Sequence, residues 1–129
     1  MAISKQVFRS GPYRDLFAQG VKVGNILTLA GQVGVDSQGK VPEDLVDQTR
    51  LAYEQIGAVL KEFGASMDNI VDETIFVTSM TEAMGNVEAV FAARAEAYGG
   101  IPEVSNTMVQ VVGLVSPEMK IEIKCIAHL

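Results

Sequence analysis

The longest periodic pattern of apolar residues in this chain predicts an amphipathic helix over 42–63. Apolar or small residues recur there at spacings of three and four, which places them on one helical face opposite charged residues. Pro42 near the start and Gly64 just after the end are typical helix boundaries. The residues of this predicted face are Leu45, Thr49, Ala52, Ile56, Val59 or Leu60, and Phe63.

Shorter patterns predict strands and a second helix. Gly24-Asn25 between apolar runs favours a β-hairpin with strands in 17–23 and 26–31, because both turn residues tolerate a positive φ. A second helical pattern covers 84–98. Further strands are predicted at 70–78, 105–112 and 119–127. This order predicts an α+β fold with one mixed sheet and two helices packed on one face.

The sheet face away from the helices is expected to be part apolar and part polar. Strand alternation in 119–127 gives a core row of Ile121, Ile123, Cys125 and Ala127 and a far-face row of Glu122, Lys124, Ile126 and His128. The same argument puts on the far face Asn106, Met108, Gln110 and Val112, and it groups Val71 with Ile75 and Val77. Such a face is too apolar to be fully wet, so we expect a closed homo-oligomer.

Composition indicates a single domain over 1–129 that does not bind nucleic acid. The 129 residues are 48% apolar, and 16 acidic against 10 basic side chains give a net charge of −6 without a basic stripe. One cysteine, Cys125, and one histidine, His128, exclude an internal disulfide and a His/Cys metal cluster, so we expect no metal and no cofactor. No signal-peptide pattern and no membrane-length apolar run occur, so a cytoplasmic protein without a membrane partner is expected.

Four sequence blocks carry a family resemblance over nearly the whole chain. They are Ala18-Gln19-Gly20-Val21-Lys22-Val23-Gly24-Asn25, Ala30-Gly31-Gln32-Val33, Gln48-Thr49-Arg50 and Lys120-Ile121-Glu122-Ile123. In these blocks and their order the chain resembles the Rid family, also called the YjgF or L-PSP endoribonuclease family. The resemblance implies a chorismate-mutase-like α+β fold and a homotrimer with small-molecule clefts between subunits. Family members with the full set of active-site residues hydrolyse reactive enamines and imines, such as 2-aminoacrylate, to the 2-oxo acid and ammonia.

The resemblance implies one catalytic carboxylate but leaves the family's substrate clamp unfilled. Glu122 matches the glutamate of the family's last strand, which orients or activates a water. The family's arginine, which suits a substrate carboxylate, lies in a Pro-x-Arg-Ser stretch that opens the fifth strand. Here Val104 or Asn106 takes that position, depending on the alignment, and neither supplies a cation. Asn106 is expected to bind a neutral or amide-bearing ligand instead.

Other positions implied by the resemblance also differ from the family pattern. The family's aromatic hydroxyl corresponds either to Phe17, counted without gaps, or to Tyr13 within the literal motif Gly-Pro-Tyr. Ala30 replaces a serine, and Met108 stands where a cysteine is often found. Arg14 in the N-terminal loop is a cation that could swing into the cleft and replace the lost arginine.

Two functions from different classes fit these residues. One is a hydrolytic deaminase that uses Glu122 and water on a substrate without a free 2-carboxylate. The other is a non-catalytic trimer that binds a small metabolite in the same cleft. An endoribonuclease is disfavoured by the net negative charge and by the lack of a basic or aromatic track.

Overall fold

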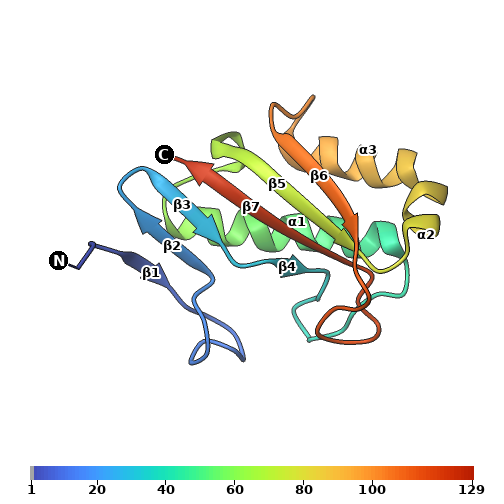
Figure 1. Ribbon diagram of the computed structural model, residues 1–129, viewed down its shortest axis with the longest axis horizontal. Coiled ribbons are helices and arrows are strands. Elements are labelled where there is room, and N and C mark those ends of the chain that lie inside the picture. The colour runs from blue at the N-terminus through green and yellow to red at the C-terminus, as the bar shows by residue number, and fades with distance from the viewer. Residues whose placement is uncertain (1) are drawn as a thin grey trace.

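Seven strands form one mixed sheet, and the helices lie together on one side of it (Figure 1). The computed structural model describes residues 2–129. Neighbouring strands follow the order β1-β2-β3-β7-β5-β6, with β4 also paired to β7, so the predicted α+β fold is confirmed. The elements are β1 (Gln6–Phe8), β2 (Gly20–Val23), β3 (Ile26–Leu29), β4 (Gln32–Val33), α1 (Leu45–Glu62), the 3-10 turn η1 (Met67–Asn69), β5 (Ile70–Val77), α2 (Met80–Gly85), α3 (Val87–Tyr98), β6 (Ser105–Gln110) and β7 (Ile121–His128).

Helix α1 follows the periodic pattern that predicted it, apart from its first turn. The helix begins after Asp44, whose carboxylate accepts a hydrogen bond from the backbone N–H of Asp47 at 3.0 Å. It ends before Gly64, which has a φ of +69°. The three residues from Pro42 to Asp44 therefore lead into the helix and cap it, although the pattern had included them in it.

The predicted helix over 84–98 is in fact two helices. Helix α2 begins four residues earlier, at Met80, and is capped by Ser79, whose hydroxyl accepts from the N–H of Glu82 at 3.1 Å. The break between α2 and α3 lies at Asn86, which has a φ of −120°. Ser79 followed three residues later by Glu82 is a helix-start signal that the apolar pattern alone does not reveal.

The short strands β1 and β4 and the position of Val71 also differ from expectation. No strand was predicted for residues 6–8 or 32–33, but β1 pairs with β2 and β4 pairs with β7. In β5 an irregularity between Ile70 and Asp72 leaves Val71 unpaired, with 44% of its surface exposed. The prediction that Val71 shares the buried face of Ile75 and Val77 is therefore wrong.

The centre of the core lies where β7 crosses the helices. The predicted core row of β7, with Ile121, Ile123, Cys125 and Ala127, is fully buried, which confirms the alternation argument for that strand. Burial raises the pKa of the Cys125 thiol to about 12, so this side chain stays neutral.

A charged network lies inside the same layer, between the sheet and the helices. Glu73 of β5 is fully buried. One of its carboxylate oxygens accepts hydrogen bonds from the hydroxyls of Tyr53 at 3.0 Å and Tyr98 at 2.8 Å. The other accepts from the Asn106 amide at 2.9 Å and from Arg94 in an ion pair. Two strands and two helices are thus joined through one carboxylate.

The pKa values of Tyr53, Tyr98 and Arg94 are all raised, which keeps each of these groups protonated as a hydrogen-bond donor to Glu73. Burial, and then the charge of Glu73, raises the pKa of Tyr53, and burial likewise raises that of Tyr98. Burial alone would lower the pKa of Arg94, but its hydrogen bond and charge interaction with Glu73 outweigh this, and the pKa is raised. The tyrosines therefore remain donors and the guanidinium remains charged.

We expect Arg94→Leu to destabilise the protein far more than the matched change Arg50→Leu. Arg94 has a side-chain exposure of 10% and neutralises a buried carboxylate, so its removal should lower the free energy of unfolding by about 3–5 kcal/mol. Arg50 pairs with Asp47 at the surface with 51% exposure, and its loss should cost less than about 1 kcal/mol. Urea denaturation of both variants measures the difference, and equal losses would contradict it.

Candidate functional site

Glu122 lies on the face of the sheet that the helices leave uncovered. Its neighbours on β7, Ile121 and Ile123, are fully buried on the helix side, while Glu122 is half-buried on the other side. In the sheet register Glu122 stands opposite Val33 of β4 and Phe76 of β5. A carboxylate is thus held between two apolar side chains in the middle of the sheet.

Gly31 forms the floor beneath this carboxylate. A Cβ atom built on Gly31 would lie 2.8 Å from the carboxyl carbon of Glu122, closer than real Cβ contacts, and 3.0 Å from its Cγ. The register is irregular here, since four steps along the chain from Thr28 to Gln32 match three steps from Ile126 to Ile123. The extra residue bends the chain at Ala30 and Gly31 and leaves the space that Glu122 fills. Ala30 precedes Gly31 in this irregular segment, and its part in ligand binding stays a prediction.

The prediction that Asn106 and Met108 lie beside Glu122 is wrong. In the parallel pairing of β5 and β6, Asn106 stands opposite buried Glu73 and Met108 opposite buried Ile75, so both side chains are on the helix side. The Asn106 amide donates to Glu73, and Met108 packs against the core. The physical reason is that the buried Glu73 carboxylate needs the hydrogen bond that the Asn106 amide donates.

The β6 side chains that do face the Glu122 side are Ser105, Thr107 and Val109. Thr107 stands opposite Thr74 of β5, and Val109 stands opposite Phe76. Val104, the alternative arginine position, lies before the strand and packs against the core. Ser105 and Thr107 thus occupy the far-face row in the first half of β6, positions that neither sequence alignment selected.

The structure does not bring the predicted N-terminal residues to Glu122. Tyr13 and Phe17 are largely exposed and stack on each other, with ring centroids 5.8 Å apart. The backbone carbonyl of Arg14 accepts a hydrogen bond from Arg9 at 2.9 Å. No hydrogen bond or ion pair among residues 2–129 joins Tyr13, Phe17 or Arg14 to Glu122. Tyr13 instead lines a cavity of about 620 Å³ next to α1, to which Glu122 does not contribute.

Lys124 is a cation on the Glu122 face that the search for an arginine missed. It follows Glu122 by two residues and stands opposite Thr74. Its ammonium group donates to the backbone carbonyl of Leu29 at 2.9 Å, directly before the irregular segment that holds Gly31. The alternation of β7 already put Lys124 in the row of Glu122, so the signal was present in the sequence.

The sequence predicts neither a metal site nor a membrane span. Within residues 2–129, no three or more His, Cys, Asp or Glu side chains are placed to hold a metal ion. No helix in that range is long and apolar enough to cross a bilayer.

Known proteins resemble this chain in sequence and in fold. The family model described as Endoribonuclease L-PSP matches residues 10–129. The mitochondrial protein mmf2 of Schizosaccharomyces pombe is 33% identical over 129 residues, covering 96% of this chain and 93% of that protein. The crystal structure of a Mycobacterium tuberculosis member of the YjgF/YER057c/UK114 family is 26% identical, with a TM-score of 0.82, and covers 98% of this chain and 100% of that one.

A third relative, TdcF of Escherichia coli, is named as a candidate reactive intermediate deaminase. It is 36% identical over 73 residues, which are 56% of this chain and 54% of that protein. Its crystal structure with bound serine has a TM-score of 0.78 at 28% identity and covers 100% of this chain and 98% of that one. The family match over 120 of 129 residues (10 to 129) and the shared fold lead to one conclusion: the chain belongs to the endoribonuclease L-PSP family, also called the Rid or YjgF family.

Proposed function

We propose that this protein is a Rid-type deaminase that hydrolyses an enamine or imine with Glu122 and a bound water. The observation that carries the proposal is the carboxylate of Glu122, half-buried over Gly31 on the uncovered sheet face. The naming of TdcF as a candidate reactive intermediate deaminase supports it. We further propose that the reaction takes place in clefts between the subunits of a homotrimer.

In this mechanism Glu122 accepts a proton from the water as its oxygen attacks the imine carbon. The C=N electron pair moves to nitrogen, Glu122 passes the proton it took from water to that nitrogen, and a carbinolamine forms. Glu122 then accepts the hydroxyl proton of the carbinolamine and transfers it to the amine, so the C–N bond breaks and ammonia leaves as the carbonyl forms. An imine and a water thus give a carbonyl compound and ammonia without redox chemistry. Phe76 and Val33 exclude other water from the carbon under attack.

The substrate is proposed to be other than a free 2-imino acid. Ser105, Thr107 and Val109 are the β6 residues on the face of Glu122, and none of them carries a charge. A carboxylate bonded to the imine carbon would therefore lack the bidentate partner that a family arginine provides at the start of this strand.

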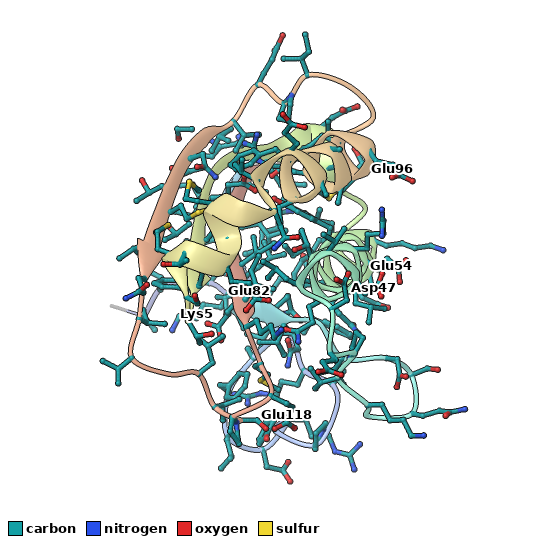
Figure 2. The ribbon with its side chains drawn as sticks, turned by 90° about the vertical axis from the view of Figure 1, so that its right-hand side faces the viewer. Lys5, Asp47, Glu54, Glu82, Glu96 and Glu118 are labelled. Atoms are coloured by element: carbon teal, nitrogen blue, oxygen red, sulfur yellow. The ribbon has the colours of Figure 1, made fainter. Side chains whose placement is uncertain are left out.

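Cleavage of RNA is not supported, despite the family's name. Asp47, Glu54 and Glu96 point outward from α1 and α3 on the side away from the sheet (Figure 2). With a net charge of −6, this surface repels phosphate backbones. A cytoplasmic location stays a prediction, because the relative from Schizosaccharomyces pombe is mitochondrial by name.

We expect the protein to sediment as a trimer at micromolar concentration. The uncovered sheet face carries apolar side chains that a monomer would leave in water, including Val23, Ile26 and Val109 with 36%, 47% and 39% of their surfaces exposed. Ile26→Asp should weaken the assembly, whereas Val71→Asp, near the start of β5, serves as the exposed apolar comparison. Analytical ultracentrifugation measures both, and a stable wild-type monomer would contradict the trimer.

We expect Glu122→Gln to lower turnover by about 100-fold or more, because glutamine has the same shape but cannot accept the proton. Ammonia release from imines generated in the assay measures the change. Glu54→Gln is the matched control, since Glu54 is exposed on the opposite side of the molecule and its change should leave turnover unaltered (Figure 2). Trimer content should be the same in all three proteins.

The outcome separates the enzyme from a metabolite-binding protein. If neither the wild type nor any variant releases ammonia, while a small carbonyl compound binds the wild type and binds Glu122→Gln with altered affinity, the non-catalytic alternative is correct. Full activity of Glu122→Gln would remove this residue from the mechanism. Dissociation of that variant into monomers would instead identify Glu122 as an interface residue.

We expect Gly31→Ala to reduce turnover by up to about 100-fold, because the added methyl group displaces the Glu122 carboxylate from its position. Gly57→Ala is the matched control, since a Cβ atom at Gly57 meets no heavy atom within 4 Å and alanine favours the helix. Turnover and thermal unfolding are measured for both variants. Unchanged turnover in a folded Gly31→Ala protein would show that the position of the carboxylate is not critical.

A further inference from the structure

Lys124 is a positive charge on the uncovered sheet face that forms no ion pair within residues 2–129, although Glu122 lies in the same row of β7 and Asp72 of β5 shares that face. The ion pairs among residues 2–129 involve other groups, namely Arg50 with Asp47, Arg94 with Glu73 and Lys120 with Glu82. The Lys124 ammonium donates one hydrogen bond, to the carbonyl of Leu29. An ammonium group has three donors, so two remain for other partners.

This unpaired charge matters because the surrounding face is the one we propose to be covered by other subunits. Moving an ammonium group out of water is unfavourable unless an anion pairs with it. The requirement follows from the proposed function and its trimer, on which this inference rests. An anionic ligand meets the requirement if it enters the cleft together with the group that Glu122 attacks.

Two hydroxyl groups continue the row that starts at Lys124. Thr74 of β5 stands opposite Lys124, and Thr107 of β6 stands opposite Thr74, so the three side chains share one face across three adjacent strands. The ammonium group contacts Leu29 of β3, on the other side of β7 from these hydroxyls. Turned toward β5, it would join them in a set of donors that suits the oxygens of a carboxylate or phosphate. The parallel row through Glu122 contains Phe76 and Val109, which are apolar. The ammonium group and the two threonine hydroxyls therefore lie on one side of Glu122, where Asp72 also shares the face and accepts a hydrogen bond from Ser105 at 2.6 Å.

We propose that Lys124 is the anion-binding residue of the Glu122 site and that the substrate carries a carboxylate or phosphate group there. Residues two apart on a strand are about 6.6 Å apart along it. The anionic group is accordingly separated from the imine carbon by two or more carbon atoms, and is not bonded to it. This arrangement distinguishes the substrate from a free 2-imino acid and explains how the site functions without a cation on β6.

Stable oxo acids test this proposal by their binding, measured by calorimetry. Levulinate carries a ketone two methylene groups from its carboxylate, pyruvate carries the carboxylate directly on the carbonyl carbon, and methyl levulinate is uncharged. The wild type should bind levulinate about 10-fold or more tighter than either of the other two. Lys124→Met should abolish this preference, and Lys124→Arg should retain it. The matched control is Lys22→Met, since Lys22 is a lysine of the same sheet on the helix side, opposite Leu27.

A phosphonate of the same length, 3-oxobutylphosphonate, identifies the source of the anion. Tighter binding of the phosphonate than of levulinate, lost in Lys124→Met, assigns the site to phosphate-bearing substrates. The reverse order assigns it to carboxylates. Either order supports Lys124 as the anion-binding residue.

Three results would overturn the proposal: levulinate binding by Lys124→Met that equals the wild type, an equal loss in Lys22→Met, or dissociation of Lys124→Met into monomers. The last result would show that a neighbouring subunit supplies the counter-charge.

Failure of the proposed deaminase function can be distinguished from failure of the anion site. Levulinate binding that survives Glu122→Gln and is lost in Lys124→Met supports the anion site even if no imine is hydrolysed. Imine hydrolysis that needs Glu122, without any preference for levulinate, overturns the anion site alone.

Discussion

The carboxylate of Glu73 is the contact through which the two layers of this protein are joined. Its oxygens accept hydrogen bonds from Tyr53 of α1, Tyr98 of α3 and Asn106 of β6, and they pair with Arg94 of α3. An ion inside a protein is tolerated only when its hydrogen-bonding capacity is filled. The network therefore requires one arrangement of these elements, because any sliding of a helix along the sheet would leave a charge unpaired.

This requirement extends to the opposite face of the sheet. Because side chains alternate along a strand, turning Asn106 inward toward Glu73 turns Thr107 and Val109 outward. The hydrogen bond that Asn106 donates to Glu73 on the helix side of β6 thus determines which β6 side chains lie at the candidate site on the uncovered face. Glu73 is a positioning residue for β6 in this sense, although it does not reach the site.

Sequence reasoning was accurate where a long pattern or a turn determined the structure. The amphipathic period predicted α1, Gly24 takes the positive φ of +58° that the hairpin requires, and alternation predicted the buried row of β7. It was less accurate where one buried polar contact or one irregular residue set the outcome. Asn106 was expected to face outward, since nothing in a single sequence shows that a buried glutamate needs its amide.

The same limit applies to the site. Glu122 was identified from its motif and Lys124 was missed although its row was predicted, and the space beneath Glu122 depends on an extra residue at Gly31 that alternation does not reveal. The cation was sought on the fifth strand because the family has an arginine there. Strand pairing was needed to show that Lys124, Thr74 and Thr107 form one row.

The close approach of Gly31 to Glu122 has a consequence for how this protein can change over evolutionary time. A side chain larger than glycine at position 31 would displace the Glu122 carboxylate, so variation at this position is coupled to the position of Glu122. Thr107 and Val109 lie on β6, at the edge of the sheet, where the subunit has no further strand to restrict side-chain size. Descendants of this chain can therefore acquire new ligand preferences through its edge strand, while the residues at the centre of the sheet remain unchanged.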